Sequence, residues 1–69
     1  MKKLGTRLKE LRKARGVGQK AVAEWLGVSL RAYQFYEDGT YDPNLPNLIA
    51  LADYFQVSLD YLVGRSDTP

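Results

Sequence analysis

The chain has 69 residues, with ten lysines and arginines, eight acidic residues, and neither cysteine nor histidine. That length allows one small domain, which we expect to fill residues 1–69 with its core at about 4–63. Without cysteine and histidine there is no thiol nucleophile, disulfide or thiolate metal site, and the commonest general base is missing. The composition therefore argues against an enzyme, and it predicts no metal, cofactor or small-molecule ligand.

The two halves of the chain carry opposite charge. Residues 1–31 hold nine of the ten basic residues and two acids, whereas residues 32–69 hold one arginine and six acids. This asymmetry indicates an anionic partner at one end of the domain; a lysine-rich, solvated helix is the alternative that charge alone leaves open. No apolar run approaches the roughly 20 residues that cross a bilayer, and no secretory signal is visible. We therefore expect a cytoplasmic protein with no membrane partner.

The first predicted helix runs from about Lys2 to Arg15. Leu4, Leu8 and Leu11 share one of its faces because they follow one another at spacings of four and three residues. Basic residues fill most of the other positions, and Gly16 ends the helix.

The second predicted helix runs from about Gln19 to Leu26, with Val22, Trp25 and Leu26 as its apolar stripe. Gly27 then supplies the positive φ that a sharp turn needs.

The third predicted helix starts at the N-cap Ser29 and runs to about Glu37, and Gly39 stops it. Tyr33 and Tyr36 lie on one face of this helix, which we expect to be buried.

A loop from Thr40 to Pro46 precedes a fourth helix capped by Asn44. The apolar residues of that helix are Leu48, Ile49, Leu51, Ala52 and Phe55. Ser58 caps a short fifth helix that runs through Val63, and residues 65–69 have the composition of a flexible tail. The whole pattern predicts an all-α domain of five short helices.

The segment from Gln19 to Gly39 is the most informative for function. Two short helices are joined by a glycine turn, and the small Ala23 leaves room where the second helix crosses the first. This pattern predicts a helix-turn-helix, an arrangement that holds its second helix outward so that it fits a DNA major groove.

Several motifs occur in order along the chain: L-x-x-x-L-x-x-L-R over 4–12, Gln19 opening the second helix, A-E-W-L-G-V-S over 23–29 and Y-E-D-G-x-x-x-P over 36–43. Together they resemble the Xre/Cro/lambda-repressor-type regulators of bacteria and phages over about residues 4–65. The resemblance implies a lambda-repressor-like domain that binds double-stranded DNA as a homodimer and regulates transcription, with repression as the expected outcome.

The base-reading residues expected on the outward face of the third helix are Leu30, Arg31, Gln34 and Phe35. Arg31 can pair bidentately with guanine and Gln34 with adenine, while Leu30 and Phe35 can pack on thymine methyl groups. A solvated charge is the alternative for Arg31, and a core position is the alternative for Phe35.

The resemblance implies that Gln19 contacts a phosphate. Loss of this contact would weaken binding to all sequences alike. The alternative is that Gln19 merely begins a helix. Lys20, Thr40 and Tyr41 are further expected phosphate contacts.

Arg12 and Glu37 resemble a pair that in this family ties the first helix to the end of the third. We expect them, with Ala23 and Gly27, to orient the reading helix without touching bases.

One departure from the family concerns residues 38–42, which carry two acids where lysine or arginine often grips the DNA backbone. The first helix is expected to lie mostly behind the reading surface and so not to compensate. A shallow salt dependence of DNA binding follows.

Tyr54, Tyr61, Leu62 and Val63 are the expected dimer face, with an ordinary core role as the alternative. Two other functions remain open: a protein-binding module on the same fold, such as an antitoxin or a phage-encoded inhibitor, and the DNA-binding half of a longer regulator.

Overall fold

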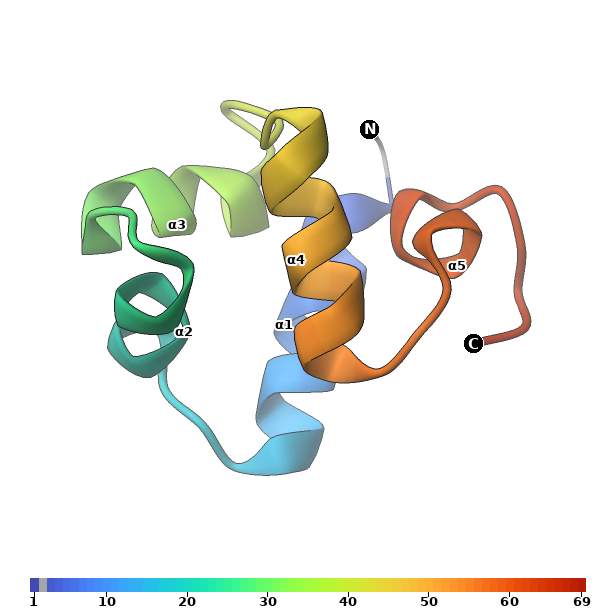
Figure 1. Ribbon diagram of the computed structural model, residues 1–69, viewed down its shortest axis with the longest axis horizontal. Coiled ribbons are helices and arrows are strands. Elements are labelled where there is room, and N and C mark those ends of the chain that lie inside the picture. Colours follow the sequence, from blue (N-terminus) through green and yellow to red (C-terminus); the bar gives the residue numbers. More distant parts are fainter. Residues whose placement is uncertain (2) are drawn as a thin grey trace.

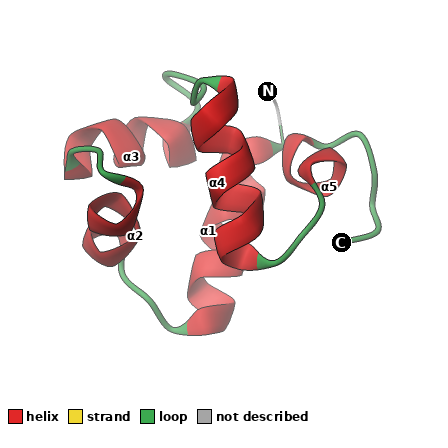
Figure 2. Ribbon diagram, viewed as in Figure 1, coloured by secondary structure: helices red, strands yellow, loops and turns green. Residues whose placement is uncertain are grey.

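The computed structural model describes Met1 and residues 3–69, so the predicted helix start at Lys2 lies outside the described residues. In this part of the chain every regular element is a helix (Figure 2). The elements are α1 (Leu4–Arg15), α2 (Gln19–Leu26), α3 (Leu30–Asp38), α4 (Leu45–Phe55) and α5 (Leu59–Val63). The predicted all-α domain of five short helices is confirmed.

The ends of the helices follow the local signals in the sequence. Three predicted N-caps are confirmed: Ser29, Asn44 and Ser58. Each side chain accepts a hydrogen bond from the backbone N–H of the residue three positions further on. Gly27 has φ 81°, which confirms the turn predicted between α2 and α3. Only α4 ends without a glycine, because Gln56 takes the positive φ there (56°).

The helices surround one core (Figure 1). α2 and α3 lie together at one end of the molecule, α1 and α4 occupy the middle, and α5 lies at the opposite end. All five helices contribute fully buried side chains, among them Leu8, Val22, Tyr33, Leu51 and Leu62. This core fixes α3 by the one face that carries Tyr33 and leaves its other face toward solvent.

Two predicted core positions lie on the surface. Trp25 is 53% exposed and Ile49 is 46% exposed. Val22 and Ala23 form the fully buried face of α2, so Trp25 falls at its edge, where it packs against the ring of Tyr54 with the ring centroids 4.6 Å apart.

The segment after α5 is held against the body of the protein. The Arg7 guanidinium donates hydrogen bonds to the backbone carbonyls of Tyr61 and Ser66 and to the carboxylate of Asp67. The carbonyl of Pro69 accepts a hydrogen bond from the backbone N–H of Ser58 at 2.8 Å. In this structure residues 65–69 return onto α1 and α5, and their flexibility stays a prediction.

Candidate nucleic-acid interface

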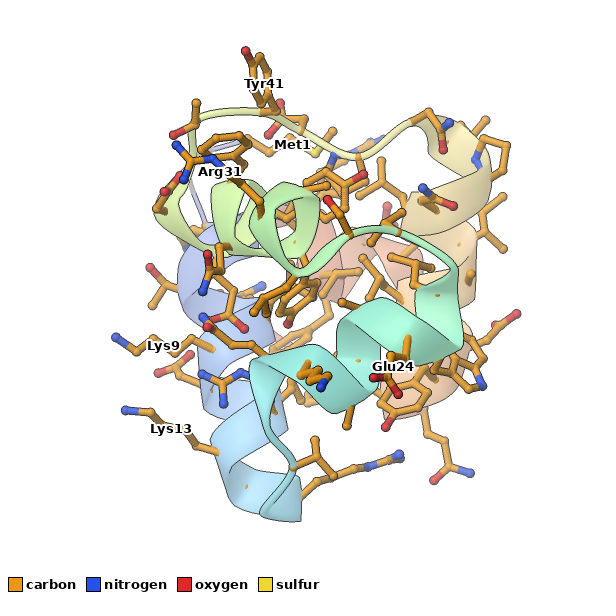
Figure 3. The ribbon with its side chains drawn as sticks, turned by 90° about the vertical axis from the view of Figure 1, so that its left-hand side faces the viewer. Met1, Lys9, Lys13, Glu24, Arg31 and Tyr41 are labelled. Atoms are coloured by element: carbon orange, nitrogen blue, oxygen red, sulfur yellow. The ribbon has the colours of Figure 1, made fainter. Side chains whose placement is uncertain are left out.

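The outward face of α3 carries the residues that the sequence predicts. Tyr33 is fully buried, whereas Leu30 is 41% exposed and Arg31 and Gln34 are also exposed. Figure 3 shows this side of the molecule, with Arg31 at its upper edge beside Tyr41. The buried Tyr33 and the half-buried Tyr36 on one face, with solvent-exposed polar groups on the other, present α3 as a rod that can enter a groove.

Phe35 is half-buried and lies between Arg31 and Tyr41. The guanidinium carbon of Arg31 is 5.1 Å from the centroid of the Phe35 ring, and the Tyr41 ring meets Phe35 edge to face at 5.2 Å. A cation over an aromatic face is held there by the ring quadrupole. Phe35 therefore supports Arg31. Its half-buried position lies between the two alternatives expected from the sequence, an exposed base reader and a core residue.

Arg12 and Glu37 form the ion pair that the family resemblance implies. Arg12 Nε and Nη2 donate to the two Glu37 carboxylate oxygens at 2.7 and 3.2 Å, and Nη1 donates to the carbonyl of Val17 at 3.1 Å. The side chains are only 12% and 5% exposed. A bidentate pair of this kind fixes geometry, so it sets the end of α3 relative to α1.

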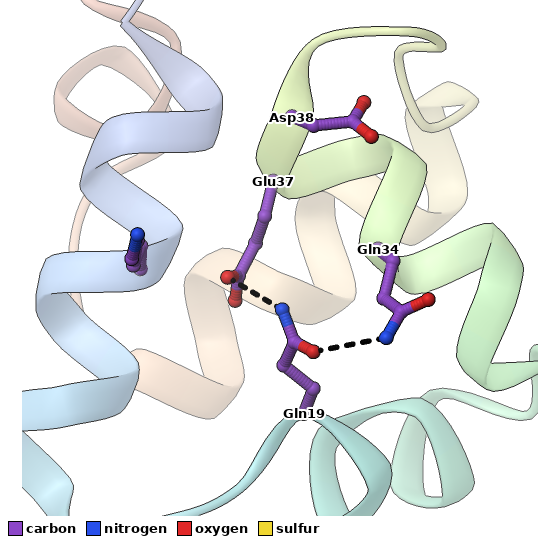
Figure 4. A pocket seen from close by; sticks show the side chains of 5 residues that line it. Gln19, Gln34, Glu37 and Asp38 are labelled. Carbon is purple, nitrogen blue, oxygen red and sulfur yellow. Dashed lines mark hydrogen bonds between the residues drawn. The ribbon is translucent and has the colours of Figure 1, made fainter.

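A chain of hydrogen bonds continues from this ion pair to the surface of α3 (Figure 4). Gln19 Nε2 donates to Glu37 Oε1 at 3.1 Å, and Gln34 Nε2 donates to Gln19 Oε1 at 3.2 Å. Gln19 thus uses its carbonyl and one amide N–H inside the protein. One side-chain N–H remains for the phosphate contact that the resemblance implies.

The charge states of this cluster follow from the same contacts. Burial alone would raise the pKa of Glu37, but the hydrogen bonds from Arg12 and Gln19 oppose it, and the pKa of Glu37 is lowered. The hydrogen bond to Glu37 raises the pKa of Arg12. Burial raises the pKa of Tyr33, whose hydroxyl oxygen has no hydrogen-bond partner within normal geometry. At neutral pH the centre of the cluster is an ionised Glu37–Arg12 pair.

Thr40 bonds to Asp38 in the turn after α3. Its backbone N–H and its hydroxyl both donate to the Asp38 carboxylate, at 2.8 and 2.6 Å. Hydrogen bonds from Thr40 also lower the pKa of Asp38. Because Asp38 takes both donors, Thr40 closes the turn after α3 in this structure. Tyr41 is 62% exposed, and the phosphate contacts of Thr40 and Tyr41 stay predictions.

Lys9 on α1 lies near this surface, although the sequence did not lead us to expect it there. A hollow of about 360 Å³ is lined by Lys9, Gln19, Gln34, Glu37 and Asp38. Lys9 precedes Arg12 by three residues and so shares its helix face, which is the signal that would have found it. Figure 3 shows the side chains of Lys9 and Lys13 extending from the same side of the molecule. The expectation that α1 lies behind the reading surface is therefore wrong for Lys9.

The predicted dimer face does not form one exposed patch. Leu62 is fully buried, which makes it an ordinary core residue. Tyr61 lies under the guanidinium of Arg7, whose carbon is 4.0 Å from the ring centroid. Tyr54 packs against Trp25, and both Tyr54 and Val63 are half-buried.

No group of three or more metal-ligating side chains gathers among the residues that the structure describes. None of the described helices combines the length and the apolar character needed to span a membrane.

Comparison with known proteins places this geometry in context. The family model described as "Helix-turn-helix" matches residues 8–62. The transcriptional repressor RstR of the cryptic phage CTXphi in Vibrio cholerae is 40% identical over 63 residues, which are 91% of this chain and 56% of RstR. The Bacillus subtilis regulator ImmR is 39% identical over 93% of this chain and 50% of its own length. The chain therefore spans about half the length of the curated relatives that it matches.

Solved structures agree with the sequence relatives. The P22 c2 repressor in complex with a synthetic operator superposes with a TM-score of 0.81 at 37% identity, covering 86% of this chain and 89% of that one. A transcriptional regulator from Listeria innocua gives a TM-score of 0.84 at 38% identity, covering 88% of this chain and 57% of that protein. With the family model matched across all but the ends of the chain, this protein belongs to the helix-turn-helix family.

Proposed function

We propose that the protein binds double-stranded DNA in a sequence-specific manner by placing α3 in the major groove. The observation that carries this proposal is the two-sided character of α3: Tyr33 is fully buried, while Arg31 and Gln34 extend into solvent. The Arg12–Glu37 pair holds the end of that helix in place. The similarity to the P22 c2 repressor, solved with an operator, supports the same mode of binding.

The exposed side chains of α3 and of the start of α2 have separate roles in this proposal. Arg31 donates to guanine O6 and N7, Gln34 reads adenine, and Leu30 packs on a thymine methyl group. Lys20 and the remaining amide N–H of Gln19 contact phosphates, which position the helix and carry no sequence information. These roles make separate predictions, because loss of a base contact changes the preferred sequence and loss of a phosphate contact does not.

We further propose that the protein acts as a two-fold dimer that represses transcription in the bacterial cytoplasm. One α3 helix reads only a few base pairs, and helix-turn-helix dimers bind half-sites about one helical turn apart. The repressors among the relatives support repression as the outcome. Sedimentation of the protein alone and with a two-half-site duplex tests the dimer; one protomer per duplex would contradict it.

Selection of bound duplexes from a random pool, at two salt concentrations, tests the function. We expect an enriched, two-fold-related sequence whose binding weakens as salt rises, because bound phosphates release counterions. No enrichment would contradict the proposal.

A protein-binding role has its own observation in favour. A second hollow, of about 640 Å³, lies beside α3 and the following loop and is lined by Phe35, Tyr41, Asp42 and others. An apolar protein contact there would hardly change with salt. Failure to enrich any duplex, together with salt-independent capture of one protein partner, would favour this role.

A further inference from the structure

The hydrogen bonds from Glu37 to the surface of α3 have a defined direction. An ionised carboxylate only accepts hydrogen bonds, and a guanidinium only donates them. Glu37 meets Arg12 on one side and Gln19 on the other, with both partners within 3.2 Å. Gln19 must therefore turn its NH₂ group toward Glu37, which leaves its carbonyl oxygen facing α3.

The same logic sets the next amide. The only group of the Gln34 amide that can bond to a carbonyl oxygen is its NH₂, and Gln34 Nε2 lies 3.2 Å from Gln19 Oε1. Figure 4 shows the outcome: the nitrogen of Gln34 points to Gln19, and its oxygen points away from the chain of hydrogen bonds. Gln34 is exposed, so this oxygen is available to a partner.

We propose that Glu37, acting through Gln19, fixes the amide of Gln34 with its oxygen outward and so makes Gln34 select a base that carries an amino group. This inference rests on the proposed function, because it concerns the same reading surface. Glu37 and Gln19 act here as positioning residues, and Gln34 is the residue that touches the base.

The orientation of the Gln34 amide decides which bases it can bind in the major groove. Adenine N6 and cytosine N4 are the amino groups that donate in the groove, whereas guanine O6 and thymine O4 accept. An outward oxygen accepts from adenine or cytosine and faces an acceptor on guanine or thymine. With adenine, the second N–H of Gln34 Nε2 can also donate to N7. A reversed amide, with nitrogen outward, would prefer guanine or thymine.

The experiment starts by locating the base that Gln34 reads. Site selection is run with the wild-type protein and with Gln34→Ala, and the position whose preference disappears is the one in contact. Every base pair holds one amino group and one carbonyl oxygen in the major groove, so the contacted group is identified with base analogues that lack one or the other at that position. We expect removal of the amino group to weaken wild-type binding roughly tenfold, as one good base contact allows, and to leave Gln34→Ala unchanged. A loss of binding on removal of the oxygen instead, or no position lost in Gln34→Ala, overturns the inference.

The Glu37→Gln variant tests the direction of the chain of hydrogen bonds. Arg12 still requires an acceptor, so the new amide turns its oxygen to Arg12 and its NH₂ to Gln19. Gln19 then accepts from that NH₂ and donates to Gln34, whose oxygen turns inward. We expect the preference at the Gln34 position to change from adenine or cytosine toward guanine or thymine, with other positions unchanged.

The Gln19→Met variant keeps the inference testable if Glu37→Gln does not fold. Methionine preserves the length of the side chain and removes both hydrogen bonds. We expect the preference at the Gln34 position to fall toward none, because the Gln34 amide is free to adopt either orientation. Lys20→Met is the matched control on the next residue of α2: it should weaken binding to all sequences alike.

The outcomes separate the two proposals. No enriched sequence for the wild-type protein means that the proposed function itself fails. Enrichment with an unchanged preference in Gln19→Met overturns the inference alone, and it assigns Gln19 to a phosphate. Thermal melting of each variant establishes that the comparison is made between folded proteins.

Discussion

A Cβ atom on Gly5 would lie 2.2 Å from the backbone carbonyl oxygen of Glu37, so α1 reaches the end of α3 only because position 5 has no side chain. The carbonyl oxygen of Tyr36 lies 3.0 Å from the same point. Both neighbours are backbone atoms that cannot rotate away. The close approach of α1 and α3 therefore requires glycine at position 5.

We expect Gly5→Ala to destabilise the domain even though alanine is the better helix former. The clash should cost about 1–3 kcal/mol as in other overpacked sites, more than the roughly 1 kcal/mol that helix propensity returns. Urea denaturation followed by circular dichroism measures the change. Gly18→Ser is the control, because a Cβ atom there meets no atom within 4 Å and serine is a good N-cap. Equal stability of Gly5→Ala and the wild type would contradict the close approach.

The Arg12–Glu37 pair predicts how stability depends on pH. The folded-state pKa of Glu37 lies below its ordinary value of 4.5. The unfolded chain therefore takes up the proton first, so the contribution of Glu37 to stability is complete above about pH 4.5 and is lost as pH falls through the folded-state pKa. Denaturation curves between neutral pH and pH 3 measure this loss.

We expect Glu37→Gln to be less stable than the wild type at neutral pH, and the difference to shrink as the solution becomes acidic. Asp53→Asn is the control, because Asp53 is exposed and makes no ion pair within the described part of the chain. A constant difference between wild type and Glu37→Gln across this pH range would argue against an ionised, paired Glu37.

Arg31 is expected to read one base pair. Arg31→Ala should lose about 1–3 kcal/mol of discrimination at that position and leave the others intact. Binding measurements on a set of single-base operator variants give the discrimination directly. Arg31→Lys keeps the charge but not the bidentate geometry, so it should retain affinity better than selectivity. An unchanged consensus in both variants would reduce Arg31 to a solvated charge.

Truncation of Trp25 and of Leu8 should destabilise the domain to different degrees. Leu8 is fully buried, so Leu8→Ala should destabilise by about 2–5 kcal/mol. Trp25 is the larger side chain but is 53% exposed, and Trp25→Ala should cost less than Leu8→Ala. Urea denaturation ranks the two variants. The reverse order would place Trp25 in the core, as its spacing in the sequence suggested.

Arg7 links α1 to the segment after α5, and its side chain is only 11% exposed. Removing the guanidinium takes a donor from the carbonyl of Ser66 and leaves the carbonyl of Tyr61 with only the backbone N–H of Gly64. The loss of a donor costs about 1–3 kcal/mol where the acceptor is buried. We expect Arg7→Ala to destabilise the domain and to speed hydrogen exchange in α5. Arg65→Ala, on an exposed residue of the same segment, should change neither.

The sequence predicted the helices well because their boundaries are local events. Ser29, Asn44 and Ser58 cap helices through their own side chains, and Gly27 adopts a backbone conformation that other residues resist. Neither effect depends on the rest of the fold. The outward face of α3 was also predictable, because the helical period places Tyr33 opposite the exposed polar residues.

The sequence alone determined the five helices, the turn at Gly27 and which residues of α3 face outward, because each depends on neighbours within about one helical turn. The tertiary structure alone decided that Gly5 admits α3, that Trp25 lies at the surface, that Lys9 reaches the edge of the reading face and that Gln19 joins Glu37 to Gln34. Those contacts join segments far apart along the chain, and their geometry is set by how the helices pack rather than by any spacing that the chain displays.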